Sequence, residues 1–454
     1  MKVPKEIIEQ EYPEDIMRAL KALEIRIGHQ IRLYDNDSVI EGVLMPRIGM
    51  GDRRVLIIKR ADGYNTGVRY SNDLKIKKIG EGEKLESFPE IAFKTNKKLP
   101  SMSIIATGGT ISSRVDYKTG AVHMLLKPEE FLFTMPEIAE IVNVRSFLTP
   151  FQLASEDMAL PDIQEIARLA AKELNSGVNG VCVTHGTDTL HYTAAALSFM
   201  LANLPAPVAL IGAQRSPDRG SNDGVLNMAC AARYCASDIS EVAVVMHGTP
   251  EDTFAFALRG TKVRKMHTSR RDTFRPINAQ PLAKIWPDGN IEEISSRLGR
   301  RKDGEVQLRE AVEPKVTFLK VFPGSNPELL EFCIDKGYKG VVVEASGLGH
   351  VPTQTTLGMN SWLPAIKRAI EEDIIIAFAP QCLYGRLQPY VYSNARIMKE
   401  LGVVYLEDLL PETAYIKLAW VLGQTKDINE AKMMLLKNIA GEFGTPGIWE
   451  TFLY

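Results

Sequence analysis

Short, almost purely apolar runs recur through the middle of this 454-residue chain, each separated from the next by a segment long enough to form a helix. A strand without polar alternation is buried on both faces, as in a parallel sheet with helices on either side. The pattern therefore predicts an α/β fold built on a parallel sheet, with strands expected at Ser103–Ala106, Gly180–Val183, Val208–Gly212 and Val242–Met246.

The same pattern of apolar runs resumes after a polar stretch at Ser295–Glu305. Apolar runs at Lys315–Val321, Gly340–Glu344 and Ile374–Phe378 predict a second, smaller α/β lobe. The tail segments Thr413–Trp420 and Asn429–Leu436 have helical periodicity. The body of the chain is therefore expected to have two lobes.

The first 80 residues have a different sequence pattern, because their apolar runs are short, closely spaced and separated by turn residues. An amphipathic helix is expected over Pro13–Ile27, followed by a small β-barrel with strands at Gln30–Tyr34, Val39–Leu44, Arg54–Lys59 and Leu74–Ile79. From Arg53 to Lys78 there are eight Lys or Arg residues against Asp62 and Asp73. This local positive charge fits a solvated face better than a nucleic-acid surface, although both readings stay open.

These changes in sequence pattern predict the domain organisation. An N-terminal helix and small β-barrel domain occupy residues 1–80, a linker 81–97, a larger α/β lobe with the active site 98–295, a second linker 296–313, and a smaller α/β lobe with a helical tail 314–454.

Composition is that of an ordinary globular protein, with 45% hydrophobic residues, 24% charged residues and a formal net charge of -2. The five cysteines are scattered without paired C-x-x-C spacing, which predicts free thiols and a reducing compartment. No run of 18 apolar residues and no signal-peptide pattern occurs. We expect a cytoplasmic protein without a membrane span.

Two of the expected strands run directly into glycine turns that present threonine hydroxyls, at Thr107–Ile111 and at His185–Thr189. Ligands of an α/β sheet bind outside the carboxyl ends of its strands, so both turns can line one crevice. A threonine hydroxyl becomes a nucleophile only when a base takes its proton. Asp188 adjoins Thr187, and either Lys262 or Lys265 can complete a proton relay with them; spacing alone does not choose between the two lysines.

Other uses of these turns are less favoured. Neither turn has a phosphate-binding G-x-x-x-x-G-K-[ST] or G-x-G-x-x-G pattern. His185 and His191 flank the second turn, but no carboxylate or cysteine falls at a recognisable ligand spacing, so no metal site is predicted.

The two threonine motifs resemble the signature motifs of the asparaginase and glutaminase amidohydrolases. Further matches are Tyr117–Val122, similar to the family's mobile-loop tyrosine segment, Ser155–Met158, similar to its substrate-binding Ser-Gln-Asp-Met stretch, and Gly347–Pro352, similar to a turn of its C-terminal lobe. Glu156 departs from the pattern, since many members have glutamine there. Arg264–Ser269 resembles the family's lysine-bearing turn, which favours Lys265 over Lys262. The resemblance covers Lys98 to Gly441 and implies a two-lobed asparaginase-like fold.

The resemblance also implies roles for individual residues. Thr110 would be the nucleophile that forms an acyl-enzyme, assisted by Tyr117, while Thr187, Asp188 and Lys265 would form a second hydroxyl relay. Substrate-binding residues would be Ser155, Glu156, Gly186 and Asp188. Which threonine attacks first stays open, with Thr110 favoured.

Ordinary family members begin almost at the first threonine strand, whereas residues 1–97 precede it here. This extension resembles the D-subunit family of archaeal-type glutamyl-tRNA(Gln) amidotransferases. The resemblance implies a glutaminase component of a carbon–nitrogen ligase in protein biosynthesis, which releases ammonia from glutamine or asparagine so that a partner converts Glu-tRNA(Gln) to Gln-tRNA(Gln).

The expected assembly is a homodimer joined by an E-type subunit in a heterotetramer. No cofactor is expected in this chain, whereas ATP and Mg²⁺ are expected in the partner, which also makes most contacts to tRNA. Two alternatives are a free-standing L-asparaginase or glutaminase with an appended regulatory domain, and a non-enzymatic RNA-binding scaffold. The second is least favoured because the set of site residues looks complete.

Overall fold

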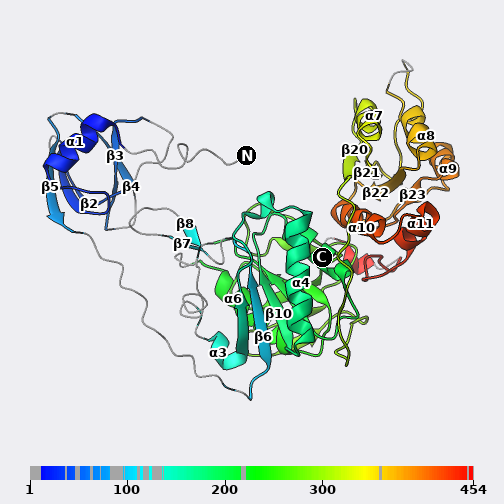
Figure 1. Ribbon diagram of the computed structural model, residues 1–454, viewed down its shortest axis with the longest axis horizontal. Coiled ribbons are helices and arrows are strands. Elements are labelled where there is room, and N and C mark those ends of the chain that lie inside the picture. Colours follow the sequence, from blue (N-terminus) through cyan, green and yellow to red (C-terminus); the bar gives the residue numbers. More distant parts are fainter. Residues whose placement is uncertain are drawn as a thin grey trace. The chain divides into compact units, whose positions relative to one another are not determined.

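The computed structural model describes residues 12–35, 38–45, 52–61, 65–71, 73–81, 96, 98–109, 113–115, 122–124, 135, 137–215, 221–356, 360–446 and 449–452. The elements are drawn in Figure 1. The chain forms two compact units, the first from Met1–Ile91 with Ser113–Leu125 and the second from Ala92–Ser112 with Leu126–Tyr454. Among the described helices, none is long and apolar enough to span a bilayer.

Among the described residues before Glu81, a five-stranded antiparallel sheet carries the helix α1 (Glu14–Ala22), which packs on it. The strand order is β4-β3-β2-β1-β5, with β1 at Gln30–Asp35, β2 at Ser38–Leu44, β3 at Val55–Lys59, β4 at Asn65–Arg69 and β5 at Lys75–Gly80. Ile16 and Leu20 of α1 share a core with Ile31, Leu33 and Ile58 of the sheet. The predicted N-terminal domain is confirmed as strand-rich, whereas its closure into a small β-barrel stays a prediction. Strand β4 is one that the sequence pattern did not reveal.

Helix α1 ends at Ala22, so the prediction that it continues to Ile27 is wrong. Glu24 adopts a left-handed backbone with φ 55°. The amide of Ile25 donates to the carbonyl of Leu20 (2.8 Å) and that of Glu24 to the carbonyl of Lys21 (3.0 Å). These two bonds are those of a Schellman motif, which ends a helix and buries the apolar residue that follows.

An eight-stranded mixed sheet forms the larger lobe of the second unit, in the order β18-β17-β14-β13-β12-β10-β6-β9. The strands are β6 (Ser101–Ala106), β9 (Asn143–Leu148), β10 (Gly180–Thr184), β12 (Val208–Ile211), β13 (Val242–His247), β14 (Ala255–Arg259), β17 (Ala283–Ile285) and β18 (Ile291–Glu293). The strands from β9 to β13 are parallel, as predicted. The edge from β14 to β18 is antiparallel, which the apolar pattern did not indicate.

Helices on both faces explain why the parallel strands are apolar throughout. Val181 and Val183 of β10 pack in one core with α4 (Leu160–Asn175) and α5 (Leu190–Met200). Cys182, between them, points into a second core with α3 (Ile138–Ile141) and α6 (Gly224–Ala236). Figure 1 shows α4 and α6 beside this sheet. Each residue along the strand therefore meets a dry surface.

The smaller lobe is a four-stranded parallel sheet in the order β20-β21-β22-β23, with strands at Val316–Lys320, Gly340–Ala345, Ile375–Pro380 and Val404–Tyr405. One core lies between this sheet and α7 (Glu328–Asp335), α8 (Leu363–Glu371) and α9 (Ser393–Leu401). The predicted tail helices are α10 (Pro411–Gln424) and α11 (Ile428–Leu436).

Helix α10 joins the two lobes, because its apolar residues belong to the same core as α5 and β10 of the larger lobe. Trp420 stacks on Phe199 of α5 with ring centroids 5.7 Å apart. The connection between the lobes is attached to the larger lobe, since β19 (Gln307–Leu308) pairs with β11 (Leu201–Ala202). The domain borders stated above stay predictions. All five cysteines are free thiols, as expected.

Candidate active site

The second threonine turn lies at the carboxyl end of β10, between that strand and the first turn of α5. His185 is fully buried beneath it. Its Nδ1 lies 2.6 Å from the carbonyl oxygen of Gly186 and its Nε2 2.9 Å from Oγ1 of Thr193. The carbonyl can only accept, so Nδ1 is protonated and the Thr193 hydroxyl donates to Nε2. Burial lowers the pKa of His185 to about 4, so the imidazole is neutral, and its two hydrogen bonds make it a fixed support for the turn.

The first threonine turn meets the second one directly. The amide and the hydroxyl of Thr107 both donate to the carbonyl of Thr184, at 3.1 and 2.8 Å. Gly108 and Gly109 follow with φ of 119° and 81°. A Cβ built on Gly109 would lie 2.6 Å from the amide nitrogen of Gly186. Glycine is required here because the two turns touch through their backbones.

Thr110 is the residue after Gly109 in the sequence. Thr110 itself lies outside the described residues. Tyr117 also lies outside them, in the connection between β7 (Ser113–Val115) and β8 (Val122–Met124), which form an antiparallel hairpin.

Thr187, Asp188 and Lys265 come together although 77 residues or more separate the lysine from the other two. The ammonium nitrogen of Lys265 lies 2.8 Å from Oγ1 of Thr187 and 2.8 Å from Oδ1 of Asp188. The lysine side chain is 10% exposed, whereas that of Asp188 is 65% exposed. An amine in contact with a hydroxyl can exchange a proton with it, and the neighbouring carboxylate fixes the amine in place.

The two candidate lysines are thereby distinguished. Lys265 is the last residue of β15 (Val263–Lys265), which pairs with β16 (Phe274–Pro276). The side chain of Lys262 instead contacts the smaller lobe, where its Nζ lies 2.8 Å from Oδ2 of Asp408. The side chains of this pair are 1% and 3% exposed. Burial lowers the pKa of Lys262 while the Asp408 carboxylate opposes that shift.

Several polar contacts from the smaller lobe hold the segment that precedes Lys265. The carbonyl of Thr261 accepts from Oγ1 of Thr413 (3.1 Å), at the start of α10. One residue before Lys265, the Arg264 guanidinium pairs with Oε1 of Glu412 at 2.9 Å. Glu412 is buried, which raises the pKa of its carboxyl group. The first turn of α10 therefore clamps the strand that presents Lys265.

Glu412 was missed by sequence reasoning. Its position after Leu410 and Pro411 is that of an acid in the first turn of a helix, which is common for reasons unrelated to a site. No local signal marks its contact with Arg264, which lies in a different lobe and far earlier in the chain.

The predicted substrate-binding residues lie beside the second turn. Ser155 begins a short 3-10 helix (Ser155–Asp157) and is buried, whereas Glu156 is exposed. A Cβ on Gly186 would lie 2.8 Å from Cβ of Ser155, and the hydroxyl of Thr189 donates to the carbonyl of Ser155 at 2.6 Å. Ser155 therefore lies against the second turn at Gly186, the residue before Thr187, and Glu156 follows Ser155 in the chain.

Family models identify three parts of the chain. An asparaginase N-terminal domain matches residues 101–297, a glutaminase/asparaginase C-terminal domain matches 315–435, and a GatD N-terminal domain matches 25–79. The D subunit of glutamyl-tRNA(Gln) amidotransferase from Pyrococcus furiosus is 48% identical over 431 residues, which cover 93% of this chain and 96% of that protein. The corresponding D subunit from Thermococcus kodakarensis is 48% identical over 435 residues, covering 94% and 96%.

The chain belongs to the D-subunit family of glutamyl-tRNA(Gln) amidotransferases. The asparaginase part of this family's fold is also seen in solved structures. The thermostable L-asparaginase from Thermococcus kodakarensis superposes with a TM-score of 0.68 at 26% sequence identity, covering 76% of this chain and 99% of the asparaginase. The D-subunit family thus combines an asparaginase-like body with the strand-rich N-terminal domain.

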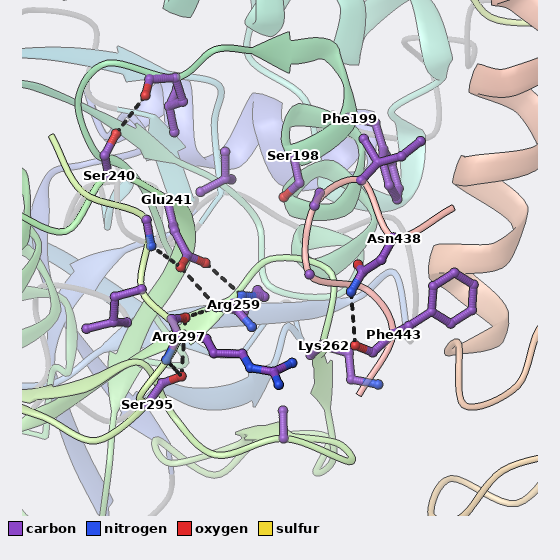
Figure 2. Close-up of a pocket in the computed structure, with 18 of the residues that line it drawn as sticks. Ser198, Phe199, Ser240, Glu241, Arg259, Lys262, Ser295, Arg297, Asn438 and Phe443 are labelled. Atoms are coloured by element: carbon purple, nitrogen blue, oxygen red, sulfur yellow. Dashed lines mark hydrogen bonds and ion pairs between the residues drawn. The ribbon is translucent and has the colours of Figure 1, made fainter. Parts of the chain in front are cut away.

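A large pocket elsewhere in this body does not contain the threonine turns. It has a volume of about 820 Å³ and is drawn in Figure 2. Its lining includes Lys262 but not Thr187, Asp188 or Lys265. The pocket and the candidate active site are therefore separate features of the asparaginase-like body.

Proposed function

We propose that this chain is the amide-hydrolysing subunit of a tRNA-dependent amidotransferase, which releases ammonia from glutamine or asparagine for use by a partner subunit. One observation supports the chemistry most: the ammonium nitrogen of Lys265 lies 2.8 Å from both the Thr187 hydroxyl and the Asp188 carboxylate. This triad lies where the two glycine turns touch. Membership of the D-subunit family supports the use of the product.

The proposed reaction begins when the Thr110 hydroxyl attacks the amide carbon, assisted by Tyr117. The tetrahedral adduct collapses as its C–N bond breaks, and the nitrogen leaves as ammonia after gaining a proton. Water then attacks the threonyl ester, which returns the Thr110 hydroxyl and releases glutamate or aspartate. Thr187, Lys265 and Asp188 would relay protons during these steps, because the lysine contacts both other groups.

Substrate recognition in this proposal depends on residues of the second turn and of the adjacent Ser155 segment. Asp188, which is mostly exposed, would bind the α-amino group of the substrate. Glu156, also negatively charged, would face the same α-amino end, whereas the Ser155 hydroxyl and the Gly186 backbone would position the α-carboxylate end. Glu156 adds a negative charge where glutamine is common in related sequences, so a preference between glutamine and asparagine can be sought by replacing it.

The identity of the nucleophile has a direct test. A slowly hydrolysed amide or a diazo-ketone analogue of glutamine should leave an acyl or alkyl group that peptide mass spectrometry can locate. We expect the adduct on Thr110, and Tyr117→Phe should slow its formation without destabilising the fold. An adduct on Thr187 would instead make the described Thr187–Lys265 pair the nucleophile and its base.

The assembly is a further part of the proposal. Two copies of this chain would combine with two copies of an E-type subunit that binds ATP, Mg²⁺ and Glu-tRNA(Gln) in the cytoplasm, and this chain would need no cofactor of its own. Co-expression with such a subunit, followed by size-exclusion chromatography with light scattering, tests the stoichiometry. Ammonia release stimulated by the partner and Glu-tRNA(Gln) supports the proposal. Full activity that no partner changes would favour a free-standing asparaginase or glutaminase.

A further inference from the structure

The pocket of about 820 Å³ in Figure 2 includes in its lining three parts of the body that are distant in sequence. They are the end of α5 with β11, the stretch from Ser295 to Lys302 between the lobes, and the segment from Asn438 to Thr445 after α11. The stretch Ser295–Glu305 stood out in the sequence as a polar, basic interruption, and the proposed reaction gives it no role.

Positive charge dominates the described lining of this pocket. Its six cationic residues are Arg259, Lys262, Arg297, Arg300, Lys302 and Arg309, and its acidic residue is Glu241. Three of the cations have carboxylate partners, because Arg259 pairs with Glu241, Lys262 with Asp408 and Arg300 with Glu293. Among the interactions of the described residues, the side chains of Arg297, Lys302 and Arg309 have no such partner. The pocket therefore has an excess of positive charge.

Arg297 is held by its backbone so that its side chain is left free. The Glu241 carboxylate accepts from Arg259 at 2.7 and 2.9 Å and from the amide of Gly299 at 2.8 Å. The Arg259 guanidinium in turn donates to the carbonyl of Arg297 at 2.6 Å. Figure 2 shows the Arg297 side chain extending from this network toward the middle of the pocket, with no interaction drawn to its guanidinium.

The free Arg297 guanidinium is suited to bind phosphate, because its planar set of N–H donors matches two oxygens of one phosphate group. Its backbone is already held by the Arg259 guanidinium, so this part of the segment does not have to be ordered on binding. The volume falls within the range of pockets for small molecules. We propose that this pocket binds a phosphate-bearing small molecule of about nucleotide size, with Arg297 as its principal contact.

The test is isothermal titration calorimetry of the full chain with inorganic pyrophosphate and with adenosine monophosphate. We expect both to bind to one site, and Arg297→Ala to weaken the binding by about tenfold or more, the effect of losing a charge-assisted hydrogen-bonded pair. Arg300→Ala is the matched control, since it removes the same charge from the same stretch but its guanidinium is already paired with Glu293. It should change the affinity by less than about twofold, because the Glu293 carboxylate already balances its charge.

Several outcomes would overturn the proposal. Equal weakening by Arg297→Ala and Arg300→Ala would mean general attraction of anions, not a site. Absence of measurable binding of both probes at millimolar concentration, or binding of RNA without binding of either probe, would also contradict it. Thermal unfolding of both variants checks that the fold is intact, and Arg297→Lys, which keeps the charge but not the planar donors, should bind between wild type and Arg297→Ala. None of these readouts requires amide hydrolysis.

Discussion

Lys262 and Lys265 lie three residues apart, but replacing each with methionine should have opposite effects on turnover and stability. Methionine keeps most of the side-chain volume. Lys265→Met removes the amine that contacts Thr187 and Asp188. General acid–base assistance is typically worth about 10²- to 10⁴-fold, so turnover should fall by that factor. The stability change should be below about 1 kcal/mol, because Asp188 is 65% exposed and exposed ion pairs stabilise little.

Lys262→Met should show the reverse. The Lys262–Asp408 pair is almost completely buried, and removing one partner of such a pair costs about 3–5 kcal/mol because the other charge is left in a dry site. Asp408 retains the amide of Gly444 at 3.0 Å, so we expect the lower end of that range, about 3 kcal/mol. Turnover of the folded variant should stay within a few-fold of wild type, since the Lys262 ammonium is paired with Asp408 in the smaller lobe, whereas Lys265 contacts Thr187.

The assay measures ammonia release from glutamine and urea unfolding on the same preparations. The assignment of the two lysines would be refuted if Lys265→Met retained wild-type turnover while folded, or if Lys262→Met lost turnover without losing stability. A double-mutant cycle with Asp408→Asn then measures how much of the Lys262 effect belongs to the buried pair.

The turns and their supports can each be tested by one substitution. Gly109→Ala should lower ammonia release at least about tenfold, as seen in steady-state kinetics, because the new Cβ would lie 2.6 Å from the Gly186 amide at a φ of 81° that disfavours alanine; unchanged kinetics would contradict the contact between the turns. The pKa of His185 is about 4 when folded and near 6.5 when unfolded, so the unfolded chain binds more protons between these values and stability should fall as pH drops from about 6.5 to 4. Urea unfolding at several pH values should show a slope smaller by about one proton for His185→Gln; an identical slope would mean that the imidazole is not held neutral. Glu412→Gln should lower kcat by about tenfold with little change in KM, because the Arg264 contact that positions the catalytic strand is weakened, whereas Glu371→Gln, at an exposed pair on α8, should change neither.

Much of the fold was predictable because burial on both faces leaves a strong signature. Val181, Cys182 and Val183 point alternately into two different cores, so no polar residue is tolerated and the strand is visible as an apolar run. β4 was missed because Val68 is its only fully buried residue and Gly67 lies at its centre. The antiparallel direction of β14 was also hidden, since strand direction depends on the connection and not on the residues of the strand.

The candidate site was predictable from local motifs only in part. The glycines of both turns mark positions where backbones approach closely, and that requirement is visible in the sequence. The choice between Lys262 and Lys265 was not, because it depends on whether each side chain faces the turns or the smaller lobe. Family resemblance supplied that choice, and the geometry of Lys265 agrees with it.

The central claim is that the ammonia released at the threonine turns becomes the amide of Gln-tRNA. It is tested most directly by incubating the chain and its ATP-binding partner with Glu-tRNA(Gln), ATP and glutamine labelled with ¹⁵N at the amide, and measuring ¹⁵N in the glutamine recovered from tRNA. We expect the label to appear in the wild-type reaction and to be lost with Thr187→Ala, while added ammonium chloride restores amidation in that variant. Undiminished transfer of label by folded Thr187→Ala, or no transfer by the wild type, would contradict the claim.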